Sequence, residues 1–144
     1  MPQFQQHRFA MQLAQLSRAW RAELDRRLVG LGLSQARWLV LLHLARFDTP
    51  PTQRELAQSV GVEGPTLARL LDGLEAQGLV SRQAVAEDRR AKQITLSAKA
   101  QPLIEQIEAI STQLRQELFA GIDPVDLQHC QRVQERILAN LEKH

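Results

Sequence analysis

The chain has 144 residues, of which 44% are hydrophobic and 24% charged, with a formal net charge of +2. This balance is typical of a folded globular chain that buries a core without disulfides, and it excludes a disordered protein. The longest run of apolar side chains covers only residues 38–42, whereas a membrane span needs about 20 residues. The N-terminal segment lacks the basic-then-apolar pattern of a secretion signal, so we expect a cytoplasmic protein with no membrane partner.

The residue types that carry most catalytic and metal chemistry are sparse. Cys130 is the only cysteine, which excludes an internal disulfide and a thiolate zinc cluster. The four histidines lack the spacing of a helical metal pair. Because no nucleophile–base pair and no phosphate-binding glycine loop is recognisable, we expect neither an enzyme nor a cofactor.

Two helices are predicted in the first third of the chain. Apolar residues recur at steps of three and four from about residue 5 to 29, which indicates one long amphipathic helix that Gly30 and Gly32 end. Ser34 is placed to cap a second helix at residues 35–47, which is apolar around much of its circumference. We therefore expect this second helix to lie at the centre of the core.

A helix-turn-helix is predicted next. Thr52 and Glu55 form a capping box that opens a short helix ending near Val60. A turn at residues 61–63 leads to another short helix, for whose first turn Pro65 is suited. Two short helices joined by three residues with a glycine in the turn are typical of this motif.

A β-hairpin and two further amphipathic helices are predicted in the rest of the chain. Residues 79–85 and 92–96 indicate strands, joined by a polar tip at residues 86–91. Apolar stripes indicate a helix from residue 98, capped by Ser97, to about residue 119, and another that begins at about residue 124. Three long amphipathic helices at the two ends cannot all cover one small winged domain, so we expect a second copy of the chain to cover them.

The order of elements, α-α-α-α-β-β-α-α, predicts a mainly α fold. We expect a winged helix-turn-helix at residues 34–97, between an N-terminal dimerisation helix at residues 1–33 and C-terminal dimerisation helices at residues 98–144. Charge is unevenly placed, since residues 79–100 are net basic and residues 62–78 are net acidic. A polyanion would therefore bind particular faces of the molecule.

The start of the second motif helix offers candidate contacts to DNA bases, because this part of a helix-turn-helix meets the major groove. Thr66 can contact a base or a thymine methyl, Arg69 can bind guanine or a phosphate, and Glu63 can accept from a cytosine amine. Pro65 lies among them. The alternative is that these are ordinary exposed helix residues, which the net acidity of residues 62–78 favours.

The hairpin tip carries two consecutive guanidinium groups, Arg89 and Arg90. An arginine on a protruding wing can enter an A·T-rich minor groove, where the narrow walls raise the negative potential. Asp88 can hold Arg90 and stiffen the tip, and Lys92 and Arg82 can add phosphate contacts. The alternative is a solvated loop with an ion pair of little value.

These motifs resemble the MarR family of bacterial transcriptional regulators. The resemblance is specific in the L-E-A-Q-G-L-V-S-R block at 74–82 and the D-R-R tip at 88–90, and residues 18–22 and 86–104 look like the SlyA branch of that family. It implies a homodimer with interlocking terminal helices, bound to a pseudo-palindrome. Recognition helices would then lie in successive major grooves and wings in the flanking minor grooves.

The resemblance also implies roles for individual residues. Arg90 matches the wing arginine, Asp88 its supporting acid, and Arg69 the basic residue of the recognition helix. The family often senses small aromatic carboxylates, and Arg18 and Trp38 fall at positions that line the corresponding crevice, where an arginine pairs a carboxylate and a tryptophan stacks a ring. The alternatives are core packing for Trp38, and a surface or dimer-facing position for Arg18.

The sequence leaves one other function open and argues against another. A winged-helix module that binds proteins and never touches DNA is compatible with the weak net charge. Redox sensing is not expected, because Cys130 lies on the apolar side of the predicted last helix, far from the N-terminal cysteine of the family's peroxide-sensing branch. We interpret His43 as a core or crevice histidine.

Overall fold

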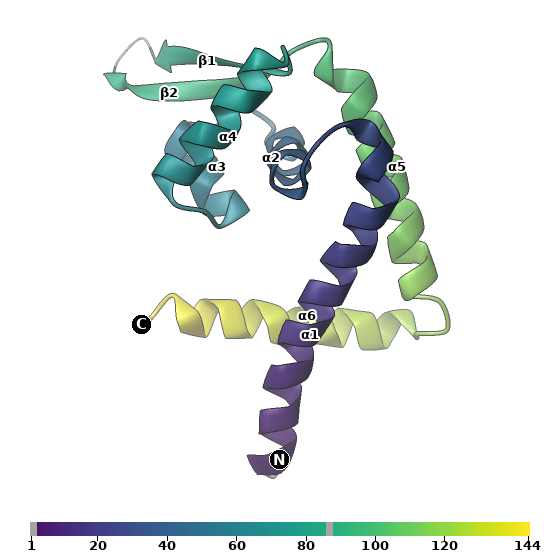
Figure 1. Ribbon diagram of the computed structural model, residues 1–144. Coiled ribbons are helices and arrows are strands. Elements are labelled where there is room, and N and C mark those ends of the chain that lie inside the picture. Colours follow the sequence, from purple (N-terminus) through teal and green to yellow (C-terminus); the bar gives the residue numbers. More distant parts are fainter. Residues whose placement is uncertain (1–2, 86–87) are drawn as a thin grey trace. The chain divides into compact units, whose positions relative to one another are not determined.

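The computed structural model describes residues 3–85 and 88–144, and it describes side chains for residues 5–84 and 91–144. The described chain forms two compact units, Met1–Thr112 and Gln113–His144. The predicted mainly α winged helix-turn-helix is confirmed (Figure 1). The elements are α1 (Gln3–Leu28), the 3-10 helix η1 (Val29–Leu31), α2 (Gln35–Ala45), α3 (Gln53–Val60), α4 (Gly64–Ala76), β1 (Val80–Val85), β2 (Asp88–Leu96), α5 (Ala100–Leu118) and α6 (Pro124–Leu141).

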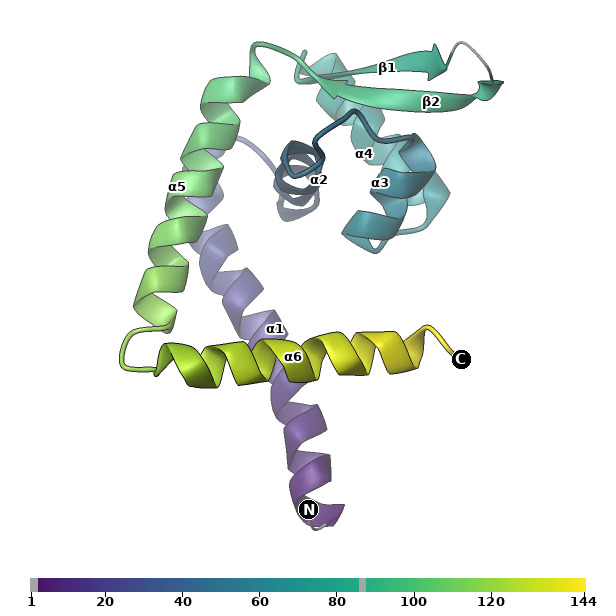
Figure 2. The ribbon, with the colours of Figure 1, turned by 180° about the vertical axis from the view of Figure 1, so that it is seen from behind.

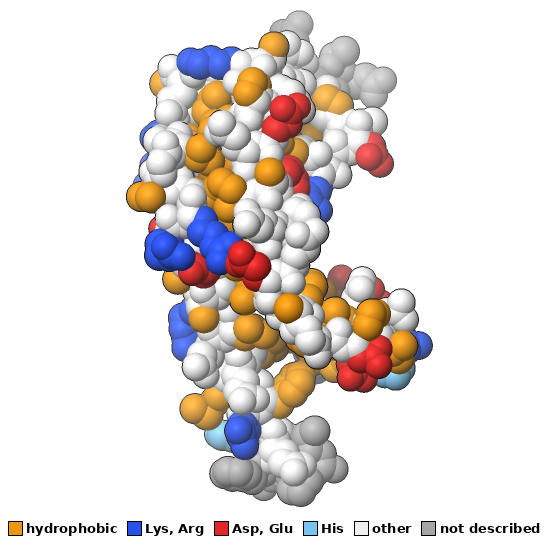
Figure 3. All heavy atoms as spheres, turned by 90° about the vertical axis from the view of Figure 1, so that its right-hand side faces the viewer, with side chains coloured by type: hydrophobic (Ala, Val, Ile, Leu, Met, Phe, Trp, Pro, Cys, Tyr) orange, Lys and Arg blue, Asp and Glu red, His pale blue; other side chains and the backbone are white. Residues whose placement is uncertain are grey.

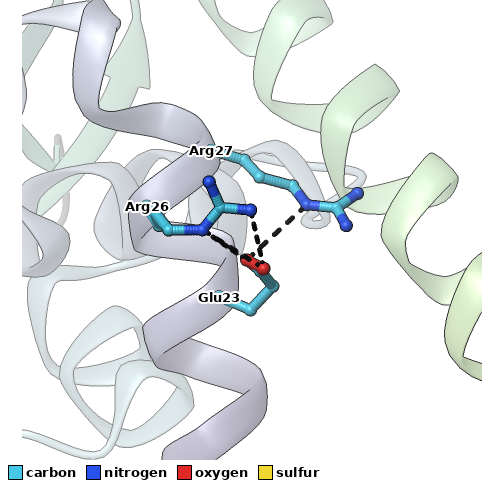
Figure 4. Close-up of polar contacts among 3 residues, drawn as sticks. All are labelled: Glu23, Arg26 and Arg27. Atoms are coloured by element: carbon cyan, nitrogen blue, oxygen red, sulfur yellow. Dashed lines mark hydrogen bonds and ion pairs between the residues drawn. The ribbon is translucent and has the colours of Figure 1, made fainter.

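The long first helix ends one residue earlier than predicted and tightens into η1. Glu23 lies one turn before the end of α1 and accepts hydrogen bonds from Arg26, with Nε–Oε2 and Nη2–Oε1 distances of 2.8 Å (Figure 4). Arg27 lies 3.9 Å from the same carboxylate. The hydrogen bond from Arg26 holds the pKa of Glu23 below its ordinary value. Two cations thus gather at the C-terminus of α1, where the helix dipole favours positive charge.

Helix α2 lies at the centre of the core of the first unit, as its apolar sequence predicts (Figure 2). Trp38 and Leu41 are fully buried on it. Other fully buried side chains of the core come from α1, α3, α4, β2 and α5, namely Leu28, Leu56, Leu67, Leu71, Leu74, Ile94 and Ile107. The helix begins at Ser34, whose hydroxyl accepts from the backbone N–H of Arg37 at 3.3 Å. Burial of these apolar side chains holds α3, α4 and the hairpin in place around α2.

The helix-turn-helix forms as its capping residues predict. Thr52 Oγ1 accepts from the Glu55 N–H, and the Glu55 carboxylate accepts from the Thr52 N–H, each at 3.1 Å. Gly61 ends α3 in the left-handed region at φ +85, which a side chain would strain. Its N–H and that of Val62 both donate to the Ala57 carbonyl. The turn between α3 and α4 is therefore held by backbone hydrogen bonds to the end of α3.

The hairpin is longer than predicted and is joined to a third short segment. Val80 pairs with Leu96 at its base, and the register shifts by a bulge after Ala84. The Ile94 N–H donates to the Pro51 carbonyl at 2.9 Å, and Thr52 bridges to Gln93. The residues that open α3 are thus also hydrogen-bonded to the wing, and hairpin and helix-turn-helix form one rigid lobe.

Helix α5 begins at Ala100, two residues later than a cap at Ser97 predicts. Ser97 accepts from the Ala100 N–H at 3.3 Å, and its hydroxyl also donates to the Gly78 carbonyl at 2.6 Å, so a turn precedes the helix. The first part of α5 runs beside the C-terminal part of α1 in both views (Figures 1 and 2). Arg46, which follows the last residue of α2, pairs with Glu108 of α5 at 3.3 Å. These contacts hold the first part of α5 in the first unit.

The second unit contains the end of α5 and α6. Asp123 caps α6 by accepting from the Val125 N–H at 2.8 Å. Helix α6 has no buried residue. On its predicted inner face Leu127 and Ile137 are half-buried, whereas Cys130 is exposed in the single chain. Exposed large apolar side chains on α6 are Val125, Val133, Leu138 and Leu141.

The N-terminal half of α1 is uncovered as well. Its apolar stripe is exposed over Phe9, Leu13 and Leu16 and becomes buried only at Leu24 and Leu28. Figure 3 shows hydrophobic side chains at the surface toward the N-terminal end of this helix. No single helix among the described residues is long and apolar enough to cross a membrane. Gln5–Leu31 and Gln35–Ala45 reach that length and composition only as a pair bent by 95°.

Candidate nucleic-acid interface

The first two turns of α4 present a polar face away from the core. Glu63, Pro65 and Arg69 are exposed and Thr66 is half-buried, whereas the core side of the same helix buries Leu67, Leu71 and Leu74. Arg69 forms no hydrogen bond or ion pair with a residue that the structure describes. The four predicted base-contacting residues therefore lie together, with a free guanidinium among them.

A hollow of about 600 Å³ lies beside this face, between α3, the start of α4 and the hairpin. Polar and charged side chains from all three elements line it, namely Gln53, Arg54, Gln58, Glu63, Arg82 and Lys92. Arg54 and Lys92 are exposed, and neither pairs with an acid in the described part of the chain. Within the described side chains, the hollow thus offers the cations of Arg54 and Lys92 and the amides of α3 to an anion.

Arg82 differs from the other cations of the hollow. Its guanidinium bonds the carboxylates of Asp72 and Glu75 on α4, the latter at 3.3 Å, and its side chain is only 17% exposed. These hydrogen bonds hold the pKa of Arg82 above its ordinary value. Arg82 therefore ties β1 to α4, and its charge is already matched by two acids.

The predicted wing contacts fall partly outside the described residues. The backbone of Asp88, Arg89 and Arg90 belongs to β2, and Asp88 pairs with Val85 close to the tip. Their side chains lie outside the described residues, so the pairing of Asp88 with Arg90 stays a prediction. The two strands nevertheless carry this segment to the far end of the hairpin (Figure 1).

The structure does not bring Arg18 and Trp38 into contact. Arg18 is exposed on α1, whereas Trp38 is 1% exposed and donates its indole Nε1–H to Oδ1 of Asp25 at 3.1 Å. Trp38 is thus packed in the core, as its alternative interpretation expected. His43 is half-buried on the same helix, with Nδ1 2.8 Å from Ser59 Oγ. Burial lowers the pKa of His43, and the charges of Arg21 and Arg46 lower it further.

Sequence reasoning missed the contribution of α3 to the hollow. Arg54 and Gln58 are one turn apart, so they share the polar face of a helix whose other side buries Leu56 and Ala57. That spacing was a usable signal. The spacing alone does not predict the hollow, because the hollow forms only where the hairpin lies beside α3 in the tertiary structure.

The packing of α2, α3, α4 and the β1–β2 hairpin defines a winged helix-turn-helix protein. A family model described as the MarR family matches residues 31–91. A solved structure described as the transcriptional regulator PA3341 is 70% identical, covers 94% of this chain and 99% of that one, and superposes with a TM-score of 0.90. The chain belongs to the MarR family, whose transcriptional regulators are non-enzymatic DNA-binding proteins. Family membership thus confirms that the chain is not an enzyme.

Two further solved structures have the same fold. A MarR-family regulator from Silicibacter pomeroyi is 26% identical and has a TM-score of 0.81, with 92% of this chain and 88% of that one covered. A MepR–DNA complex from S. aureus is 22% identical, also with a TM-score of 0.81, and covers 92% of this chain and 97% of that one. At this identity the second likeness shows the fold alone.

Proposed function

We propose that this chain is a homodimeric, sequence-specific transcriptional regulator of the cytoplasm, of the SlyA-like branch, that binds a pseudo-palindromic operator. One observation carries the proposal: both acids within α4 are already bonded to a cation of the wing. Asp72 and Glu75 bond Arg82, while Arg69, Arg54 and Lys92 around the start of the helix pair with no acid among the side chains that the structure describes. The net acidity of residues 62–78 therefore does not oppose DNA binding, because two of these carboxylates are already paired.

The start of α4 would read bases in the major groove. Thr66 and Arg69 lie on its outward face, where a hydroxyl or methyl meets a base edge and a guanidinium meets guanine O6 and N7. Pro65 and Glu63 lie at the entry to the helix, and Glu63 would disfavour a phosphate close to its carboxylate.

Phosphate contacts would come from the hollow and the wing. Arg54 and Lys92 would neutralise backbone phosphates, and their release of counterions makes affinity salt-dependent. Arg90 would enter the flanking minor groove, with Asp88 holding it and Arg89 on the adjoining backbone. Arg82 would act indirectly, by fixing the wing on α4 through its paired acids.

Dimerisation would use the terminal segments, residues 1–33 and 98–144. The apolar stripes of α1 and α6 are exposed in the single chain, and exposed faces of this kind mark protein interfaces. A two-fold dimer pairs each patch with its copy, and it presents two α4 helices to two half-sites. The MepR–DNA complex shows that this fold binds DNA in that protein.

Regulation by a small aromatic carboxylate is proposed from the resemblance, with Arg18 as the carboxylate partner. Because Trp38 is buried and bonded to Asp25, an effector would influence it through the packing of α2 against α1. Ligand binding would change the population of DNA-competent dimers.

Selection of bound sequences from a random DNA pool at fixed salt tests the proposal. We expect an inverted repeat with half-sites about 10 base pairs apart and A·T-rich flanks. A pool that shows no enriched sequence would contradict it. If retention on a random-DNA column does not change with salt concentration, the result would instead favour a winged-helix module that binds proteins.

A further inference from the structure

A side chain of α2 occupies space on α4 that exists only because residue 73 is glycine. A Cβ on Gly73 would lie 2.6 Å from Cζ and 2.9 Å from Nε of Arg37, so the guanidinium at the end of this flexible side chain would have to move off the helix. Gly73 does not belong to the glycines with positive φ, so no turn requires it. Glycine in a helix interior is unfavourable relative to alanine, and its presence here is therefore explained by the room it leaves for the guanidinium.

The same guanidinium is held at the next turn of α4. Arg37 Nη1 donates to Oε1 of Gln77 at 3.2 Å, in a partly buried contact. The backbone at both partners is fixed: the Arg37 N–H donates to the Ser34 cap, and the Gln77 carbonyl accepts from Lys99 Nζ at 2.9 Å. Arg37 thus links the first turn of α2 to the C-terminal end of α4, and the backbone from which each partner side chain extends is held by hydrogen bonds.

This link bears on the face of α4 that carries the base-contacting residues. Gly73 follows Arg69 by four positions and Thr66 by seven, so the three share one side of the helix. A rigid helix transmits a rotation at its C-terminal end to its N-terminal turns. The orientation of Thr66 and Arg69 therefore depends on the contact at Gly73.

We propose that Arg37 is a positioning residue for DNA reading, which it performs by seating its guanidinium on Gly73 and bonding Gln77. The inference rests on the proposed function of α4 and adds residues that touch no DNA. A lysine cannot replace Arg37, because an ammonium lacks the planar fork that fills the space over Gly73 while bonding Gln77.

A double-mutant cycle tests this with Gly73→Ala, Arg37→Ala and the double variant. The readouts are the affinity ratio between the selected duplex and a scrambled duplex, and the salt dependence of binding. We expect each single variant to lower the ratio roughly tenfold, and the double variant to lower it no further, because both changes break one contact. The salt slope should stay that of the parent, since no phosphate contact is lost. Gly30→Ala, at a glycine with open space around it, controls for the effect on stability of replacing a glycine by alanine.

Thermal unfolding gives a second readout. Alanine is the better helix former, so Gly73→Ala should raise the melting temperature in the Arg37→Ala background and fail to raise it in the parent. Arg37→Lys should lose the affinity ratio as Arg37→Ala does.

The inference would be overturned if both single variants kept the affinity ratio of the parent. It would also be overturned if the losses of the two single variants multiplied in the double variant, or if Arg37→Lys kept the full ratio. A reduced salt slope in Arg37→Ala would also overturn it, by making Arg37 a phosphate contact. A parent that discriminates no duplex would instead overturn the proposed function, and this inference with it.

Discussion

Trp38 on α2 donates its indole N–H to the carboxylate of Asp25 on α1, 3.1 Å away, in a site where the ring is 1% exposed. This bond joins the central helix of the winged lobe to the helix that we propose forms the dimer.

The variant Trp38→Phe keeps most of the apolar ring and leaves Asp25 without the hydrogen bond from the indole. We expect a loss of about 1–3 kcal/mol in the free energy of unfolding, measured by urea titration. Asp25→Asn, which keeps an acceptor, should cost less; equal stability of Trp38→Phe and the parent would contradict the role of the bond.

His43 should make the fold acid-sensitive. Its pKa in the folded state lies below the ordinary 6.5 because of burial first, and of Arg21 and Arg46 second. The unfolded chain therefore takes up the proton first, so the contribution of His43 is complete above about pH 6.5 and is lost as pH falls through the lower folded pKa. Urea midpoints of the parent should drop on going from about pH 7.5 to about pH 5. His43→Asn should show a smaller drop, and an identical drop would contradict the assignment.

Arg54 and Lys92 should set part of the salt dependence of DNA binding. Each Arg54→Ala or Lys92→Ala change should weaken binding to all duplexes similarly and reduce the slope of log affinity against log salt by about one. Fluorescence anisotropy at several salt concentrations measures this. Arg82→Ala is a useful contrast, because Arg82 is already paired and its loss should disturb the wing rather than remove one phosphate contact. Unaltered slopes in both variants would exclude the hollow from the interface.

Arg69 should contribute to sequence preference. Arg69→Ala should cost about 1–3 kcal/mol of binding free energy and relax the preference at one or two bases of each half-site. Competition among duplexes with single-base changes checks it. A uniform loss at every position would instead make Arg69 a phosphate contact.

The exposed stripe of α1 should be covered by a second copy. Leu13 and Leu16 are 43% and 55% exposed in the single chain. Leu13→Asp with Leu16→Asp should weaken self-association by about 100-fold or more, because a buried, unpaired carboxylate costs several kcal/mol. Light scattering measures the mass, with Gln15→Asp, off the stripe, as the control. A parent that is monomeric at every concentration would contradict the dimer.

Local signals determined most of the fold. The capping box of Thr52 and Glu55, the turn at Gly61 and the apolar stripes acted through neighbours along the chain, and these elements were predicted with nearly correct bounds. The pairing of Pro51 with Ile94 and the delayed start of α5 at Ala100 were missed, because both depend on hydrogen bonds to segments distant in sequence.

The site was predictable in its residue types but not in its pairing. The basic residues of the wing and of the start of α4 were proposed from their order in the sequence, and their role stays a prediction. The pairing of Arg82 with Asp72 and Glu75, by contrast, needs β1 to lie on α4. The space over Gly73 is invisible in the sequence for the same reason, since nothing in the sequence places Arg37 against that glycine.

Titration of a labelled inverted-repeat duplex against a scrambled duplex of equal length, with stoichiometry read by light scattering, tests the central claim most directly. The account predicts two chains per inverted repeat, affinity well above that for the scrambled duplex, and loss of that affinity in Arg90→Ala with self-association intact. One chain per duplex, or equal affinity for both duplexes, would contradict it.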